Sequence, residues 1–354
     1  MSDFAMRHAA FRVQVQSALD AFMARHTPAL ADISPELAPT VSALTEFLAG
    51  GKRLRPACAY WGYLGAGGVD DAIIAASASL ELLQASALIH DDVMDNSDSR
   101  RGQPSMHRQF EARHRAEELH GDAEDFGAAA AILIGDLALA WTDTMYYESG
   151  FDLAALARGK HVLDAMRTEL MAGQFLDVTE QARGGGSVER AQRVMRFKTT
   201  AYTIERPLHL GAALAGASQA TFDAYTAFGV PLGEAFQLRD DLLGVFGDAA
   251  ETGKPAGDDL REGKRTVLIA IAHERATPAD RARLDELVGN PKLSIDGVDE
   301  TREILERTGA RSDVEARIES NRAKAVDALH SPAIGSDAAD MLRQLAIAAT
   351  DRSA

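Results

Sequence analysis

The chain has 354 residues, 46% of them hydrophobic and 25% charged, so it is long and apolar enough to bury a large core. Lysine and arginine number 37 against 53 acidic residues, and the formal net charge of −16 argues against nucleic-acid binding through the overall field. Cys58 is the only cysteine, so no intrachain disulfide can form. The N-terminus lacks a signal-peptide core, and the most apolar stretch, 128–140, is too short to span a bilayer. We therefore expect a cytoplasmic protein without stable membrane insertion.

Stretches rich in Ala, Leu, Glu and Arg dominate the chain, and the alternation typical of strands is scarce. Helices are predicted, in chain order, at about 3–27, 37–49, 53–65, 70–97, 105–120, 124–149, 156–181, 188–215 and 219–246, with shorter ones after 258. Glycine-rich segments separate several of them. Because no linker is long enough to divide the chain, we expect an all-α fold in which residues 1–354 form a single domain built as a bundle of long helices.

The first acidic cluster ends the predicted helix 70–97 and contains Asp91, Asp92 and Asp95. Positions four apart share a helix face, so Asp91 and Asp95 point the same way, while Asp92 is rotated by about 100°. Like charges at this spacing destabilise a bare helix, and oxygen-only ligands favour magnesium. Arg100 and Arg101 follow directly and are suited to gripping phosphate oxygens. The alternative is a solvated helix end paired with its own arginines.

A second acidic cluster lies roughly 150 residues later, within 236–243, and contains Asp240 and Asp241. Gln237 precedes Asp240 by three residues and therefore shares its face of the predicted helix. Carboxylates next to basic residues suggest a cation that is shared with a second anion. Magnesium together with a diphosphate satisfies both halves of that pattern.

Six motifs in a fixed order extend this pattern over about residues 45–270. They are GGKRLRP at 50–56, the first cluster with RRGQP at 100–104, GQFLD at 173–177, Lys198-Thr199, FQLRDD at 236–241, and TGKP at 252–255 followed by DLREGK at 259–264. This ordered set resembles the trans-isoprenyl diphosphate synthases, or polyprenyl synthetases. The resemblance implies the isoprenoid synthase fold, with helices around a central active-site cavity, a single polyprenyl synthetase domain and a homodimer.

The resemblance also implies a reaction. Three Mg²⁺ ions bind the diphosphate of an allylic substrate (dimethylallyl, geranyl or farnesyl diphosphate) between the two aspartate motifs. The C–O bond ionises to an allylic cation and pyrophosphate, and the double bond of isopentenyl diphosphate attacks the cation. Pyrophosphate removes the proton. The enzyme is then a trans-prenyltransferase that works mainly by stabilising the leaving group and positioning the substrates.

The resemblance further assigns roles to residues. The catalytic set is Asp91, Asp92, Asp95, Arg100, Lys198, Asp240 and Lys254, with Asp91, Asp95 and Asp240 as the metal ligands and Asp92 and Asp241 in support. The allylic diphosphate is expected to contact Arg100, Lys198, Thr199, Gln237, Lys254 and Lys264. Isopentenyl diphosphate is expected to contact Lys52, Arg55, Gln84 and Arg101. Gln174 and Asp177 fit an internal polar bridge at least as well as a catalytic role.

The second motif departs from the family pattern, which usually has a third aspartate four residues after the first. Gly244 occupies that position, and Asp248 follows one turn later. The spacing of Asp240, Gly244 and Asp248 also resembles the second metal motif of class I terpene cyclases. A cyclase does not need a site for a second diphosphate, which the basic residues near 52–55 and 101 imply, so we favour chain elongation. A non-catalytic regulatory subunit is a third alternative, disfavoured because both acidic and basic residues are present.

Product length is expected to depend on the helix that carries Asp91, because one turn toward its N-terminus descends about 5.4 Å, roughly one isoprene unit. The expected chain-length pocket consists of Leu83, Ser86 and Ala87. The two small residues leave no shallow floor, so a C20 product, geranylgeranyl diphosphate, is the first choice, with farnesyl or longer products as alternatives. Another predicted helix offers large side chains for the floor, namely Trp141, Tyr146 and Tyr147.

Overall fold

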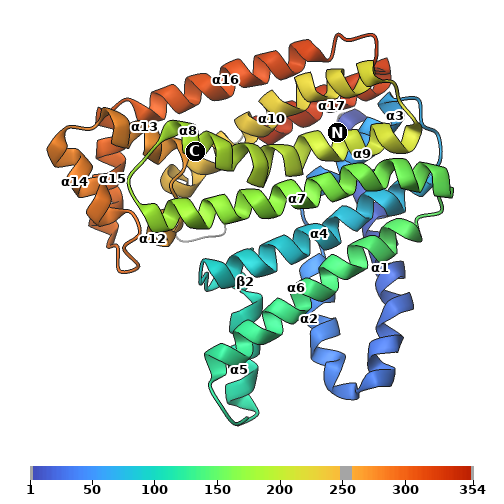
Figure 1. Cartoon of the computed structure of the whole chain (residues 1–354), viewed down its shortest axis with the longest axis horizontal. Helices are drawn as coiled ribbons and strands as arrows, with labels where there is room; N and C mark the ends of the chain where they lie inside the picture. The colour runs from blue at the N-terminus through green and yellow to red at the C-terminus, as the bar shows by residue number, and fades with distance from the viewer. Residues whose placement is uncertain (1–2, 248–256, 352–354) are drawn as a thin grey trace.

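The computed structural model describes residues 3–247 and 257–351, and these are almost entirely helical (Figure 1). The long helices are α1 Asp3–Ile33, α4 Ala72–Met94, α6 Ala123–Tyr147, α7 Leu153–Arg183, α10 Gln219–Phe246 and α16 Ala310–Ala328. The shorter ones are α2 Ala38–Leu48, α3 Leu54–Gly65, α5 Met106–Ala116, α8 Val188–Val194, α9 Arg206–Ala215, α12 Asp258–Glu262, α13 Val267–Arg275, α14 Pro278–Leu287, α15 Ile295–Arg307 and α17 Ser336–Thr350. A 3₁₀ turn, η1 Pro35–Leu37, precedes α2. The all-α prediction is confirmed.

Apolar side chains gather in three clusters that share helices. One cluster joins α1 to α4, α6, α10 and α17, and a second joins α10 to α13, α15 and α16. The third lies between α3, α4, α7 and α9. Because α10 contributes to two clusters and α4 to two, these helices form the frame against which the others pack. Figure 1 shows α7, α9, α10 and α16 side by side, with α4 and α6 below them.

Within residues 3–247 and 257–351, two helices are long and apolar enough to cross a membrane by length and composition alone: α4 and α6. The apolar stretch at 128–140, which was predicted to be too short to span a bilayer, is part of the longer, 25-residue helix α6. In α4, 67% of the apolar window is buried inside the protein, as expected for a core helix. In α6 only 33% is buried, so this helix keeps an exposed apolar face.

The helix predicted at 188–215 is in fact three segments. Ser187 caps α8 by accepting a hydrogen bond from the Arg190 backbone N–H, and α9 begins at Arg206. Between them, η2 Met195–Glu205 is a π-helix, in which hydrogen bonds join residues five apart. Periodicity near 3.6 residues cannot distinguish such a segment from an α-helix, so the sequence prediction was wrong at this point. π-helical turns are concentrated at functional sites.

A tight hairpin follows α4. Strand β1 Ser99–Arg100 pairs antiparallel with β2 Gln103–Pro104, so Arg101 and Gly102 form the turn. Their φ angles of 54° and 75° are those of a type I′ turn, which suits the twist of a two-residue hairpin. The hairpin directs Arg100 back along the end of α4. Arg53, before α3, is likewise left-handed with φ of 53°, a conformation that costs energy outside glycine.

Candidate active site

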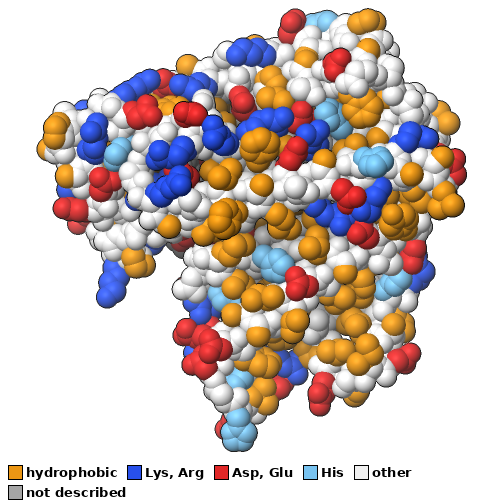
Figure 2. Space-filling view, viewed as in Figure 1, with side chains coloured by type: hydrophobic (Ala, Val, Ile, Leu, Met, Phe, Trp, Pro, Cys, Tyr) orange, Lys and Arg blue, Asp and Glu red, His pale blue; other side chains and the backbone are white. Residues whose placement is uncertain are grey.

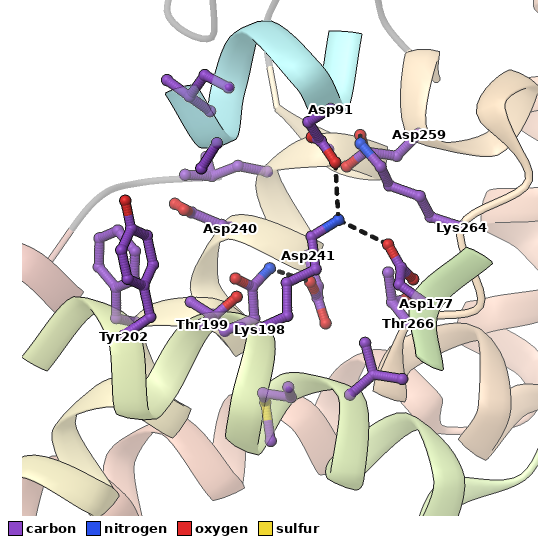
Figure 3. Close-up of a pocket in the computed structure, with 18 of the residues that line it drawn as sticks. Asp91, Asp177, Lys198, Thr199, Tyr202, Asp240, Asp241, Asp259, Lys264 and Thr266 are labelled. Atoms are coloured by element: carbon purple, nitrogen blue, oxygen red, sulfur yellow. Dashed lines mark hydrogen bonds and ion pairs between the residues drawn. The ribbon is translucent and has the colours of Figure 1, made fainter. Parts of the chain in front are cut away.

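A cavity of about 740 Å³ opens where α4, α7, η2 and α10 converge, with α12 closing one side. Most of the predicted site residues lie in its wall: Lys52, Arg55, Gln84, Ala87, Asp91, Arg100, Lys198, Thr199, Gln237, Asp240 and Lys264. Figure 3 shows the acidic and basic side chains of this wall pointing toward one another from separate elements. The predicted Lys254, together with Asp248, lies outside the residues that the structure describes.

Asp91, in the first acidic motif, accepts hydrogen bonds from side chains of two other helices. Its Oδ1 accepts hydrogen bonds from Gln174 Nε2 at 2.8 Å and from Lys198 Nζ at 3.0 Å. Lys198 Nζ also lies 2.6 Å from Asp177 Oδ2. Burial would raise the pKa of Asp91, but the cations of Lys198, Lys264 and Arg100 outweigh it and lower the pKa to about 2. Asp91 is therefore ionised and available to a cation at neutral pH.

Asp92 points away from the cavity and holds Arg100. Its side chain is fully buried, and both Arg100 Nε and Nη2 donate to it, the former at 2.9 Å from Oδ1. The same guanidinium approaches Asp91 Oδ2 at 3.9 Å. The rotation of Asp92 expected from the helix geometry is thus observed, and its effect is to fix a cation beside Asp91.

Asp95 lies behind the cavity wall and faces Lys264. Its side chain is 2% exposed, and Lys264 Nζ lies 3.6 Å from Asp95 Oδ2. Neither carboxylate oxygen has a hydrogen-bond donor among the described residues. Burial, with the neighbouring charge of Asp91, raises the pKa of Asp95 to about 6. Lys264 also contacts Glu262 Oε2 at 2.5 Å and Asp259 Oδ1 at 3.2 Å.

The second acidic motif faces the first from α10. Asp240 lines the cavity, while Asp241 accepts a hydrogen bond from Gln237 Nε2 at 2.8 Å. Burial raises the pKa of Asp241 to about 8, although this hydrogen bond works in the opposite direction. Burial therefore favours the neutral form of Asp241, and both Asp240 and Asp241 line the cavity.

A second group of residues, formed by Lys52 and Arg55 with Gln84, lines the cavity near η2. Arg55 Nη2 donates to Thr203 Oγ1 at 2.8 Å, and its guanidinium lies 4.2 Å from the Tyr202 ring centroid. The Tyr202 hydroxyl donates to Gln84 Oε1 at 2.7 Å. These contacts hold the Arg55 guanidinium over the Tyr202 ring, and Lys52 lines the same cavity wall. The group is suited to a second anion.

Arg101 lies next to the site but is not part of the cavity wall. Its Nη1 donates to Phe47 O at 3.3 Å, and the guanidinium lies 5.5 Å from the Phe47 ring. The left-handed turn residue Arg101 is directed toward the end of α2, whereas Arg100 lines the cavity. The Arg101 guanidinium also lies beside Gly51, because a Cβ on Gly51 would be 3.8 Å from Arg101 Nη2, so the contact of Arg101 with isopentenyl diphosphate stays a prediction.

The chain-length pocket is only partly as expected. Ala87 lines the cavity, but Leu83 and Ser86 are fully buried behind it. Leu83 packs in the cluster of α3, α4 and α7 that lies beneath the cavity. The aromatic alternative places no ring in the cavity wall: Trp141 packs against Phe22 and His26, the Tyr146 hydroxyl bonds Leu156 O, and Tyr147 is half exposed.

The carboxylates fit magnesium that is shared with a phosphate ligand. Among residues 3–247 and 257–351, no three His, Cys, Asp or Glu side chains converge into a ready-made metal cage. Instead, one or two carboxylates project from each motif, as for magnesium bound through few carboxylates plus substrate phosphates. The buried Asp95 oxygens, which lack hydrogen-bond donors, have free capacity for a cation. The residues present therefore fit the ion.

The sequence analysis missed or undervalued four side chains of the candidate site. Asp177 and Gln174 join the Asp91–Lys198 group, and the GQFLD motif was the available signal. Tyr202 lies near the same face as Lys198 and could have been found by its spacing of four. Asp259 lines the cavity from α12, a position that no helical pattern connects to α10.

Comparisons with known proteins agree with this geometry. The polyprenyl synthetase family model matches residues 39–305. A short chain isoprenyl diphosphate synthase of Methanothermobacter thermautotrophicus is 32% identical over 79% of this chain and 80% of its own length. A geranylfarnesyl diphosphate synthase of Aeropyrum pernix is 33% identical over 84% of this chain and 89% of its own.

A solved structure extends the likeness over nearly the whole chain. The geranylgeranyl pyrophosphate synthase of Corynebacterium glutamicum, solved with isoprenyl diphosphate and magnesium, is 45% identical and superposes with a TM-score of 0.94. The alignment covers 97% of this chain and 99% of that one. The chain therefore belongs to the polyprenyl synthetase family, the magnesium-dependent trans-prenyltransferases that make isoprenyl diphosphates.

Proposed function

We propose that the protein condenses isopentenyl diphosphate with an allylic diphosphate, head to tail, and that its main product is C20 geranylgeranyl diphosphate. The observation that carries this proposal is the pair of acidic motifs facing each other across one cavity with a basic group on each side. The C20 product is supported by Ala87 in the wall and by the name of the Corynebacterium structure.

The allylic diphosphate would lie between the acidic motifs, where Lys198, Arg100 and Lys264 surround the carboxylates. These cations stabilise the charge that builds on pyrophosphate as the C–O bond breaks. Asp91, Asp95 and Asp240 would hold Mg²⁺, three ions in our proposal, which neutralise the diphosphate when bound. Thr199 and Gln237 present polar groups in the wall nearby.

Isopentenyl diphosphate would bind at the other basic group, formed by Lys52, Arg55 and Gln84. Its double bond then attacks the allylic cation to form the new C–C bond, and the proton lost from the adjacent carbon goes to pyrophosphate. Tyr202, whose hydroxyl donates to Gln84, lines the cavity and presents its ring to the Arg55 guanidinium. Holding both substrates in one cavity provides the proximity that the condensation requires.

The second basic group distinguishes this proposal from the alternatives. A terpene cyclase acts on one diphosphate and has no use for Lys52 and Arg55 beside Gln84. A regulatory subunit would not need Asp91 held by Gln174 and Lys198, nor Arg100 fixed by a buried Asp92.

The test is a product analysis. Purified protein is incubated with Mg²⁺, isopentenyl diphosphate and, in turn, dimethylallyl, geranyl and farnesyl diphosphates, and the dephosphorylated products are sized by mass spectrometry. Linear C20 alcohol is expected from each primer. Cyclic hydrocarbons formed without isopentenyl diphosphate would indicate a cyclase, and absence of turnover with all primers would indicate a regulatory subunit.

Product length is expected to follow the side chains below Asp91. Ala87→Phe fills the cavity one turn beneath the diphosphate, so the product should shorten to C15 or less. Leu83→Ala removes bulk beneath the cavity and should lengthen it. Ser86 was also expected in the chain-length pocket, but its side chain is fully buried, so Ser86→Phe should overpack the interior and lower stability. Mass spectrometry of the products and thermal melting separate the outcomes; an unchanged length in Ala87→Phe would contradict the assignment.

We also propose a homodimer of single-domain, cytoplasmic subunits, formed through the apolar face of α6 and the neighbouring part of α7. Figure 2 shows apolar side chains gathered over α6 on one face of the molecule. The exposed ones are Phe126, Ile132 and Leu133 on α6 and Met171, Phe175 and Val178 on α7. Such a large apolar surface on one face is typical of protein interfaces.

Leu133→Arg is expected to dissociate this dimer, because it places a charge at the centre of the apolar face, where Leu133 is 68% exposed. Light scattering coupled to size exclusion measures the mass. Val69→Arg is the matched control, since Val69 is 91% exposed but lies in the α3–α4 connection. A monomeric parent, or a Leu133→Arg variant that remains dimeric, would rule out this interface.

A further inference from the structure

Gly244 is the point at which the second acidic motif departs from its family. It lies four residues after Asp240 on α10, hence on the same helix face, and it lines the same cavity. Glycine is disfavoured inside a helix, so its presence there needs a packing reason. The structure provides such a packing reason on the face of α10 that carries Asp240 and Gly244.

The space beside Gly244 is occupied by Asp259 of α12. A Cβ placed on Gly244 would lie 1.9 Å from Asp259 Oδ2 and 2.9 Å from its Cγ. Both distances are far below van der Waals contact, so no side chain at position 244 can coexist with Asp259 where it now lies. The glycine therefore admits a carboxylate from another helix into the position that its own side chain would otherwise fill.

Asp259 also faces the first acidic motif. Its Oδ1 lies 3.2 Å from Lys264 Nζ, and the same ammonium lies 3.6 Å from Asp95 Oδ2. Asp95 is the side chain that is 2% exposed and lacks hydrogen-bond donors among the described residues. Figure 3 shows Asp259 and Lys264 side by side next to Asp91, in the same pocket as Asp240. Asp259 thus lies where carboxylates of both motifs converge.

We propose that Asp259 is the third carboxylate of the second motif, supplied through space rather than along α10, and that it helps Asp240 hold a divalent cation. The proposal rests on the function proposed above, in which Asp240 binds Mg²⁺ together with a diphosphate. The competing interpretation is that Asp259 only neutralises Lys264 and that Gly244 merely avoids a clash. The two interpretations predict different effects on Mg²⁺ binding when an aspartate is placed at position 244 in the absence of Asp259.

Four variants separate them: Asp259→Ala, Asp259→Asn, Gly244→Ala and the double variant Gly244→Asp/Asp259→Ala. Asp259→Asn keeps the size but removes the charge, while Gly244→Ala displaces Asp259 and adds no carboxylate. The double variant returns the carboxylate to α10 with the clash removed. The readout is the Mg²⁺ concentration that gives half of the thermal stabilisation produced with inorganic pyrophosphate. The Mg²⁺ dependence of condensation is measured alongside, and melting without Mg²⁺ reports folding.

We expect the three single variants to raise the half-stabilising Mg²⁺ concentration by about 10–100-fold, the range typical when a group supporting a metal site is removed. The double variant should recover most of the parent affinity. An unchanged Mg²⁺ requirement in Asp259→Asn, or no recovery in the double variant when it folds, overturns the proposal. If the double variant fails to fold, Asp259→Asn alone decides. A parent that binds Mg²⁺ and pyrophosphate but condenses no substrates would refute the proposed function instead.

Discussion

Asp91→Ala is expected to lower kcat by at least about 10³-fold. Asp91 is the side chain on which Gln174 and Lys198 converge and which the Arg100 guanidinium approaches, so its loss removes the metal ligand that we propose and a hydrogen-bond partner of two neighbouring groups. Stabilisation of leaving-group charge by a bound metal amounts to several kcal/mol, and each 1.36 kcal/mol is a factor of about ten in rate. The loss should therefore greatly exceed that of a surface substitution.

The measurement is steady-state condensation over a range of Mg²⁺ concentrations, with circular dichroism to verify folding. Asp164→Ala is the matched control, because Asp164 is a half-exposed carboxylate on α7 that pairs with Lys160 and lies outside the cavity wall. It should retain parent activity. Asp91→Asn keeps the shape and should lose nearly as much as Asp91→Ala. If Asp91→Ala kept more than a tenth of the parent kcat, Asp91 would not be a metal ligand.

Glu81→Ala is expected to cause the largest loss of stability. The Arg53–Glu81 pair is buried, with side chains 2% and 7% exposed, and Arg53 Nη2 also donates to Gln16 Oε1 and Leu48 O, both at 2.5 Å. Removal of one partner leaves a guanidinium buried without its counter-charge, which costs about 3–5 kcal/mol. Arg53 lies between Lys52 and Arg55, so the same change should also loosen the second basic group.

Urea denaturation measures the first effect, and the KM for isopentenyl diphosphate measures the second. Glu319→Ala is the control for stability, because Glu319 forms an exposed pair with Arg322 on α16 and should change the free energy of unfolding by less than about 1 kcal/mol. We expect Glu81→Gln to be milder and to raise KM for isopentenyl diphosphate more than it lowers kcat. Equal stability losses in Glu81→Ala and Glu319→Ala would contradict this account.

Much of the fold and of the site follows from local pattern. Helix periodicity and glycine breaks located the long helices, because an amphipathic helix repeats its apolar residues every three or four positions. The expectation that Asp91 and Asp92 face differently was met for the same reason. Spacing within one helix also relates Gln237 to the carboxylates of α10, one of which it contacts.

What the sequence could not predict depends on contacts between elements. Asp259 of α12 occupies the space beside Gly244 of α10, and a contact between two helices cannot be predicted from the residue pattern of either helix alone. Arg101 is turned toward α2 by a hairpin whose φ angles no charge pattern reveals. The π-helical η2 was taken as α-helix because both produce nearly the same apolar repeat over a few turns.

The π-helical segment has a further consequence for how the two substrates are spaced. In η2 the backbone hydrogen bonds stack residues five apart, so Lys198, which contacts Asp91, lies above Thr203, which holds Arg55. In an α-helix the same two positions would be turned about 140° apart. The separation of the two diphosphate sites that we propose is therefore defined by the main chain of one segment. Even with the side chains of η2 unchanged, the loss or gain of a single residue in this segment would shift Lys198 relative to Thr203 and so change the spacing of the two proposed sites.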